Sequence, residues 1–196
     1  MKKDITKKKE CVLCGSKKLK KVLDFKKTPL ANSYIKFTKK RERHYPLVCV
    51  LCIDCKHLQL QHLVNPKILF EDYMYVSGTS PVLVKHFENY FYKIKKSLKL
   101  NKKKDKILDI ACNDGTLSKE LLKYGCFLVG VDPFSKAISE LEGIKNTQVI
   151  NDFFNLPLVT EFSLEESFDI VIVTNVISHV FDFCDFMQAL SKVVKP

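Results

Sequence analysis

The sequence lacks any long uninterrupted hydrophobic run, although 46% of its 196 residues are hydrophobic. No segment approaches the roughly 18 apolar residues that a membrane-spanning helix needs. The N-terminal stretch MKKDITKKKECVLCG also lacks the apolar segment of a secretory signal peptide. We therefore expect a cytoplasmic protein, whose eight cysteines are thiols or metal ligands rather than disulfides.

One segment, Lys106–Pro133, has the pattern of a nucleotide-binding unit. A short apolar run over 107–111 is followed by the small-residue turn Cys112–Gly115, a helical leucine pattern and a second apolar run that ends on Asp132. The turn lets backbone approach a ligand, and the following helix offers free N–H groups at its start. Asp132 stands roughly 20 residues past the turn, where a carboxylate can accept hydrogen bonds from both ribose hydroxyls.

The turn also lacks two of the three glycines of the dinucleotide fingerprint, since Ala111 and Asn113 stand in the other tight positions. Asn113-Asp114-Gly115 could instead be a simple hairpin turn, but the flanking segments do not alternate as hairpin strands do. The single glycine disfavours NAD and suits a nucleoside ligand without a pyrophosphate, for which S-adenosylmethionine (SAM) is the obvious candidate.

The remaining C-terminal sequence continues this pattern. We expect a helix over 135–141, a short strand over 148–150, a continuous apolar strand over 168–174 and a last helix over 183–194. The segment 175–179 then lies beyond the carboxyl end of a parallel strand, where open α/β sheets bind ligands.

Charge divides the chain near residue 106. Residues 1–106 hold 27 Lys and Arg against 9 Asp and Glu, whereas residues 107–196 hold 6 against 13. This break indicates two modules with different partners. The basic part could meet nucleic acid or a phosphorylated small molecule, or its lysines could be solvated surface.

The cysteines of the basic part have metal-ligand spacing. Cys11 and Cys14 form one CxxC pair, and Cys49, Cys52 and Cys55 allow two alternatives for the other. Either alternative completes four sulfurs for a tetrahedral structural zinc. We expect an inserted loop around 28–45 between the two pairs.

The segment between the two parts is aromatic and then helical. Ser80-Pro81 is typical of a helix start, and apolar residues then follow one helical stripe, which consists of Leu83, Phe87, Tyr90, Phe91, Ile94 and Leu98. The expected organisation is a zinc-binding module over 1–66, this aromatic and helical segment with its charged linker over 67–104, and a nucleotide-binding domain over 105–196.

Together these motifs resemble the zinc-containing, SAM-dependent sugar C-methyltransferases of deoxysugar biosynthesis. In the N-terminal part, the resemblance rests on the CxxC segment that begins at Cys11 (a zinc knuckle), on Pro46-Leu47 before the second knuckle with Cys52 and Cys55, and on Gln59-Leu60. Further along, it rests on the Tyr-x-Tyr-x-Ser stretch at 73–77, the 112–115 loop, and Asn175-Val176 with His179-Val180. It implies a class I, Rossmann-like parallel sheet behind a small zinc module. It also implies zinc on Cys11, Cys14, Cys52 and Cys55, with Cys49 outside the site and Lys56 in place of the family's usual glycine.

The resemblance further implies the residues of the SAM site and of catalysis. The SAM-binding residues would be Asp109, Ala111, Asn113, Gly115, Asp132, Asp152, Phe153 and Asn175. His179 would be a candidate base near a nucleotide-linked keto sugar, with Tyr75 beside it. Removing a proton alpha to a carbonyl gives an enolate that attacks the sulfonium methyl, and a histidine titrating near neutrality suits that step.

The sequence departs from this family in length, since it supplies only the first four strands of an expected seven. We therefore expect a truncated chain, with the strand at 170–173 on a sheet edge that pairs with another chain or itself. Turnover by these residues alone is not expected. The alternatives are an rRNA methyltransferase with a zinc module and a non-catalytic fragment that binds zinc and SAM.

Overall fold

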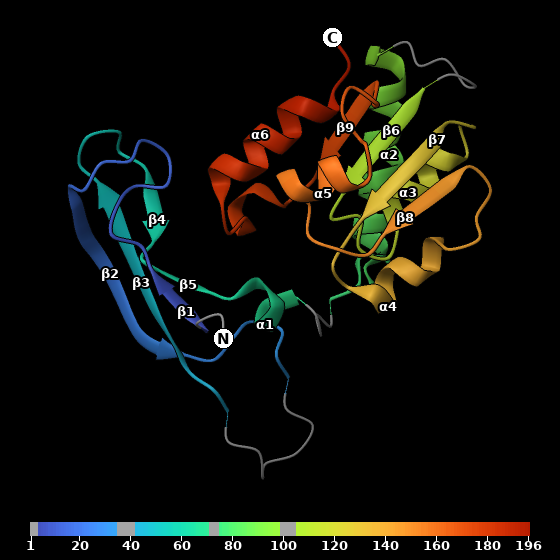
Figure 1. Cartoon of the computed structure of the whole chain (residues 1–196). Helices are drawn as coiled ribbons and strands as arrows, with labels where there is room; N and C mark the ends of the chain where they lie inside the picture. The colour runs from blue at the N-terminus through green and yellow to red at the C-terminus, as the bar shows by residue number, and fades with distance from the viewer. Residues whose placement is uncertain (1–3, 35–41, 71–74, 99–104) are drawn as a thin grey trace. The chain divides into compact units, whose positions relative to one another are not determined.

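The computed structural model describes residues 4–34, 42–70, 75–98 and 105–196, and these form two compact units (Figure 1). The first comprises Met1–Tyr75 with Phe181–Cys184, and the second comprises Val76–Val180 with Asp185–Pro196. No helix in the described ranges has the length and apolar character needed to cross a membrane.

The first unit is built from two small antiparallel sheets. A three-stranded sheet has the order β2-β3-β4, and a two-stranded sheet pairs β1 with β5. The bounds are β1 (Ile5–Lys7), β2 (Leu19–Thr28), β3 (Tyr45–Cys52), β4 (Leu58–Leu60) and β5 (His62–Val64), followed by a short helix α1 (Pro66–Phe70). The loop predicted around 28–45 connects β2 to β3, and its central part, 35–41, lies outside the described residues.

Strand β2 was not predicted from the sequence. Eight of its ten residues are exposed, so LKKVLDFKKT shows no alternation between a buried and a solvated face. Its partner β3 does alternate in part, with Val48, Val50 and Cys52 buried. Cross-strand pairing with β3, rather than burial of its own side chains, therefore defines β2.

The second unit contains a parallel four-stranded sheet of order β8-β7-β6-β9. These strands are β6 (Lys106–Ile110), β7 (Phe127–Val131), β8 (Thr147–Ile150) and β9 (Ile170–Val173), and each neighbouring pair is parallel. The apolar strand expected over 168–174 is therefore shorter, and it lies at an edge of this sheet.

Helices and short helical turns cover both faces of the sheet. They are η1 (Ser77–Thr79), α2 (Pro81–Leu98), α3 (Thr116–Leu122), α4 (Ser135–Ile138), η2 (Ser139–Leu141), α5 (Leu156–Glu161), η3 (Ile177–His179) and α6 (Phe183–Val193). On one face Leu108 and Val129 pack with residues of α5 and α6. On the other, Ile107 and Leu128 pack with α2 and α3. Burial on both faces is why β6 and β7 are almost continuously apolar.

The expected helices are present, with corrections at their ends. The hydroxyl Oγ of Ser80 accepts a hydrogen bond from the backbone N–H of Leu83 at 3.4 Å, which confirms the start of α2. Leu98, however, is 54% exposed and does not belong to the buried stripe. The helix expected over 135–141 is α4 followed by the 3-10 turn η2.

Candidate metal centre and cofactor site

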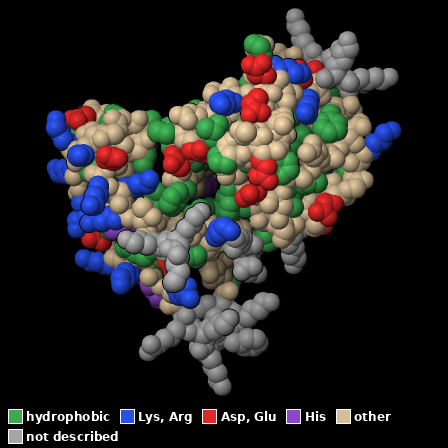
Figure 2. Space-filling model, viewed as in Figure 1, with side chains coloured by type: hydrophobic (Ala, Val, Ile, Leu, Met, Phe, Trp, Pro, Cys, Tyr) green, Lys and Arg blue, Asp and Glu red, His purple; other side chains and the backbone are tan. Residues whose placement is uncertain are grey.

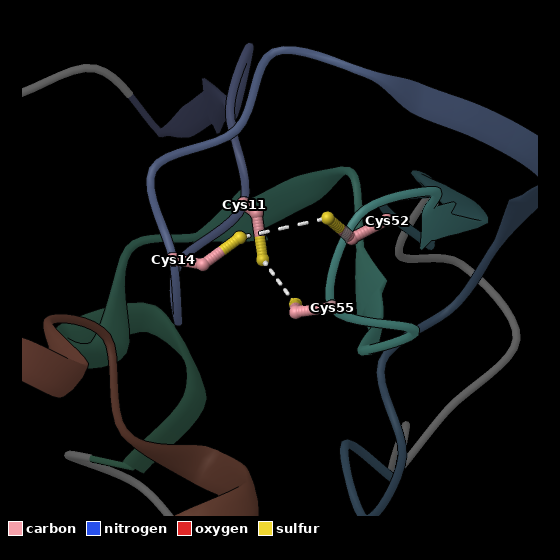
Figure 3. Close-up of side chains that lie close together, drawn as sticks. All are labelled: Cys11, Cys14, Cys52 and Cys55. Carbon is pink, nitrogen blue, oxygen red and sulfur yellow. Dashed lines mark hydrogen bonds between the residues drawn. The ribbon is translucent and has the colours of Figure 1, made fainter.

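Four sulfurs converge in the first unit. Figure 3 shows the side chains of Cys11, Cys14, Cys52 and Cys55 pointing toward one another, with all four Sγ atoms within 4.8 Å. The Sγ atoms of Cys11 and Cys55 lie 3.6 Å apart, as do those of Cys14 and Cys52. Ligands at the usual Zn–S distance of about 2.3 Å in a tetrahedron lie about 3.8 Å apart. The donor set therefore fits zinc, with no open position for a substrate.

The structure resolves the choice between Cys49 and Cys55. Cys49 lies within β3, where it pairs with Leu23 and Leu60 of the neighbouring strands. It is not among the four clustered sulfurs. The second knuckle is therefore Cys52–Cys55.

The two knuckles have the same backbone hydrogen bond and the same backbone conformation after the second cysteine. The N–H of Gly15 donates to the carbonyl of Cys11 at 2.9 Å, and the N–H of Lys56 donates to that of Cys52 at 3.0 Å. Gly15 and Lys56 both have a positive φ, 73° and 64° respectively. Lys56 thus occupies a left-handed position that favours glycine. The N–H of Cys55, pointing at the Cys52 sulfur, is the main cause that lowers the pKa of Cys52 to about 6.

Gln59 links the two knuckles, a role that its place in the Gln-Leu pair did not reveal. Its amide oxygen Oε1 accepts from the N–H of Val12 at 2.9 Å, and its Nε2 donates to the carbonyl of Glu10 at 3.1 Å. The side chain is only 8% exposed. Gln59 therefore fixes the backbone on both sides of Cys11 from a strand that follows Cys55.

In the second unit, the residues predicted to bind SAM follow the carboxyl ends of the parallel strands, except Asp109, which lies within β6. Asp132 follows β7, and both its oxygens accept backbone N–H groups. Oδ2 takes the N–H of Asn113 at 2.9 Å, and Oδ1 takes that of Phe134 at 2.8 Å. Each carboxylate oxygen keeps a second lone pair. The carboxylate is thus fixed in orientation and fits a ligand with two neighbouring hydroxyls.

Asp109 lies inside β6 and is only 1% exposed. Its Oδ2 accepts a hydrogen bond from the hydroxyl of Ser118 in α3 at 2.6 Å. Burial raises the pKa of Asp109 to about 7, with the nearby Asp132 adding to the effect. The geometry makes Asp109 a support between strand and helix, and its predicted contact with SAM stays a prediction. Sequence reasoning missed Ser118, because nothing local marks it as a partner.

The loop after β6 takes unusual backbone conformations. Ala111, Asn113 and Gly115 have φ values of 56°, 53° and 70°. A Cβ at position 115 would overlap the side chain of Leu141, so glycine is required there for space as well as conformation. The loop is held to β7 because the N–H of Ala111 donates to the carbonyl of Val131 at 2.8 Å.

The other predicted residues lie beyond β8 and β9. Asp152 is exposed, and its Oδ1 accepts from the N–H of the half-buried Phe153 at 2.7 Å. Asn175 has a φ of 57°, and His179 is exposed at the end of η3, where its N–H donates to the carbonyl of Val176 at 2.7 Å. Tyr75 is 42% exposed and belongs to the first unit, so its pairing with His179 stays a prediction.

Comparisons with known proteins match two separate stretches of the chain. Residues 11–70 match a family described as "Putative zinc binding domain". Residues 108–196 match a family described as "Methyltransferase domain". The four sulfurs lie in the first match, and the loop after β6 with Asp132 lies in the second.

Curated relatives match either most of the chain or its C-terminal half. The C-methyltransferase NovU of Streptomyces niveus is 23% identical over 190 residues, which are 95% of this chain and 45% of NovU. The mitochondrial ubiquinone biosynthesis O-methyltransferase of Homo sapiens is 31% identical over 97 residues, which are 46% of this chain and 26% of that enzyme. The chain thus spans less than half the length of these relatives.

Solved structures are similar to part of this chain. A protein from Pyrococcus horikoshii is 25% identical with a TM-score of 0.49, over 62% of this chain and 54% of that one. The magnesium protoporphyrin IX methyltransferase of Synechocystis is 18% identical with a TM-score of 0.45, over 58% and 56%. The strand order, the family matches and the four-sulfur cluster show that the chain carries a zinc-binding module and a SAM-binding, Rossmann-like methyltransferase domain.

Proposed function

We propose that this chain is the zinc-binding and SAM-binding part of a methyltransferase that methylates carbon in a nucleotide-linked keto-deoxysugar. The observation that carries this proposal is the extent of one similarity. The C-methyltransferase NovU matches 95% of the chain, which takes in the zinc module as well as the methyltransferase domain. The human ubiquinone O-methyltransferase matches 46%.

The SAM site would use the residues that follow β6, β7 and β8. Asp132 would accept the ribose hydroxyls, because backbone N–H groups already orient its carboxylate. Asp152 and Phe153 would contact the adenine, and Ala111, Asn113 and Gly115 would shape the backbone beside the cofactor. Bound SAM would supply an electrophilic methyl group on a sulfonium, and the net charge of residues 107–196 is favourable for that cation.

His179 is the proposed base. It would take a proton from the carbon next to the substrate carbonyl, and the C–H electron pair would move into the enolate that becomes the carbon nucleophile. His179 is exposed and lies beyond the carboxyl end of β9, at the edge where open α/β sheets bind ligands. Tyr75 is proposed as a second residue with a part in catalysis.

O-methylation is the second candidate, because the ubiquinone O-methyltransferases reach higher identity over the C-terminal half. The enzyme from Bradyrhizobium diazoefficiens, for example, is 32% identical over 93 residues. An oxygen acceptor would need only deprotonation of a hydroxyl, which His179 could also perform. RNA methylation remains a further alternative because of the 27 Lys and Arg in residues 1–106.

Binding measurements separate these candidates without requiring turnover. The zinc-loaded chain with SAM analogue present would be titrated with a dTDP-linked 3-keto-deoxysugar, with dTDP alone and with ribosomal RNA fragments. Saturable binding of the keto sugar above that of dTDP supports the proposal. Tighter RNA binding with a steep salt dependence would contradict it. Where product forms, carbon NMR distinguishes a C-methyl from an O-methyl group.

Association of the chain through the edge of its parallel sheet is also a proposal. In the described part of the chain, β9 pairs with β6 on one side only. Phe168, just before β9, makes an isolated parallel bridge with Val194 on the other. Unpaired strand edges promote association, so light scattering of residues 1–196 should show a dimer or larger species. A monomer at all concentrations would contradict this expectation.

A further inference from the structure

The turn η1 is attached to the cofactor loop through backbone-to-side-chain hydrogen bonds. The N–H of Ser77 donates to Oδ1 of Asn113 at 3.0 Å. The next N–H, of Gly78, donates to Oδ2 of Asp114 at 2.8 Å. Two consecutive residues of the turn thus bind two consecutive residues of the loop, 36 positions further along the chain.

Gly78 is needed for this contact because of space. A Cβ built at position 78 would lie 2.7 Å from Oδ2 of Asp114 and 3.0 Å from the hydroxyl of Thr116. Its φ is not in the left-handed region. Replacement by alanine would therefore create a steric conflict with Asp114 while leaving the backbone conformation unstrained.

Asp114 connects the turn to α3 as well. Its Oδ1 accepts hydrogen bonds from the N–H of Thr116 at 3.2 Å and from its hydroxyl at 2.7 Å. The side chain is 7% exposed, and a buried carboxylate needs such partners because desolvation is costly. The turn η1 contributes one of the three donors, so releasing the turn would also loosen the loop around Asp114.

The loop depends on such contacts because its conformation is intrinsically unfavourable. Ala111 and Asn113 are non-glycine residues with positive φ, a conformation that is unfavourable for L-residues, and less so for asparagine than for alanine. Asn113 is held on both sides, since its N–H donates to Asp132 and its side chain accepts from Ser77. Asn113 therefore connects Asp132, the proposed ribose ligand, to the turn η1.

We propose that Asn113 and Asp114 are positioning residues that latch η1 onto the cofactor loop, and that SAM affinity depends on this latch. The inference rests on the proposed SAM site and assigns a role to a segment, 77–79, that lies before the methyltransferase family match. When the hydrogen bonds from Ser77 and Gly78 to Asn113 and Asp114 are broken, the cofactor loop is free to leave its SAM-binding conformation. The apparent affinity falls in proportion to the fraction of molecules that are competent to bind.

The test is a double-substitution cycle on the whole zinc-loaded chain. Gly78→Ala should raise the SAM Kd roughly tenfold if about one molecule in ten keeps the latch closed. Asp114→Ala should weaken binding similarly, and Gly78→Ala added to Asp114→Ala should have a smaller effect than in wild type, because the closer of the two groups that the added Cβ meets is gone. Val82→Ala, at a nearby side chain that is 81% exposed, is the control and should leave Kd unchanged.

Hydrogen exchange provides a readout that loss of stability alone would not move. The amides of Ser77 and Gly78 should exchange more slowly when SAM is added to wild type, and this protection should be absent in Asp114→Ala while amides of β6 keep theirs. Two results would overturn the latch alone, provided that wild type binds SAM. One is an equal SAM affinity in Gly78→Ala and wild type, and the other is a lack of SAM-induced protection at the amides of Ser77 and Gly78 in wild type. Wild type that fails to bind SAM would overturn both the latch and the proposed function.

Discussion

The two units of this protein are stabilised by different means. The second unit has a hydrophobic core on both faces of a parallel sheet, including fully buried Leu108, Leu128 and Phe168. In the described part of the first unit, the fully buried side chains are few, and Cys52 is among them. Figure 2 shows many Lys and Arg side chains on the visible surface of that unit. Zinc bound by the four cysteines would supply stability that this small core does not.

Because of this difference, we expect substitutions in the two units to act through different effects on stability. A module with little apolar burial folds with its metal, since metal binding contributes to folding free energy directly. A unit with a packed core tolerates loss of a polar contact but responds to buried charge.

The largest effect is expected at the metal centre. Cys52→Ala should remove zinc and unfold residues 1–75, because apparent zinc binding energies at Cys-rich sites are on the order of 10 kcal/mol. Cys49→Ala should keep close to one zinc per chain, since Cys49 lies outside the four-sulfur cluster. Metal analysis and limited proteolysis measure both. Equal zinc loss in the two variants would reject the ligand set.

A smaller effect, dependent on pH, is expected at Asp109 in the second unit. Burial raises its folded-state pKa from 3.8 to about 7, so the folded state keeps a proton that the unfolded state releases. Stability is therefore lost as pH rises from about 4 to about 7, and no more is lost from this group above that range. Asp109→Asn should lack this part of the pH dependence, as urea unfolding at pH 5 and 8 would show. Exposed Asp152→Asn is the matched control, and parallel pH profiles for wild type and Asp109→Asn would contradict the assignment.

A still smaller loss is expected on substitution of Gln59, which links the two CxxC segments. Gln59→Leu leaves the N–H of Val12 and the carbonyl of Glu10 without their hydrogen-bond partner. Outer partners of metal sites typically contribute about 10-fold or more to metal affinity, so zinc should be lost at a lower chelator concentration. Exposed Gln188→Leu should not change the chelator midpoint. An unchanged midpoint in Gln59→Leu as well would show that the link is not needed.

The smallest effect is expected at Lys56. Glycine suits its φ of 64°, so Lys56→Gly should stabilise the zinc-loaded first unit by about 1 kcal/mol or less, because the gain is partly offset by unfolded-state entropy. Lys17→Gly, at an exposed residue outside the knuckles, should give no such gain. Thermal unfolding measures the difference, and destabilisation by Lys56→Gly would contradict this view of the knuckle.

The sequence was most informative where structure depends on neighbouring residues. Apolar runs located β6 to β9, and CxxC spacing with the family resemblance selected Cys52 and Cys55. Contacts between distant segments were not predictable in this way. Gln59 reaches across 47 positions to Val12, and Gly78 reaches across 36 to Asp114. Strand β2 was missed because lysines occupy both of its faces.

The most direct test of the account is calorimetric titration of SAM into the zinc-loaded chain and its Asp132→Ala variant. Wild type should bind one SAM per chain. The variant should bind roughly 30-fold more weakly, because it loses two ribose hydrogen bonds of about 1 kcal/mol each. Glu161→Ala, at an exposed residue of α5, should match wild type. Unchanged affinity in a folded Asp132→Ala protein would remove Asp132 from the site and contradict the account.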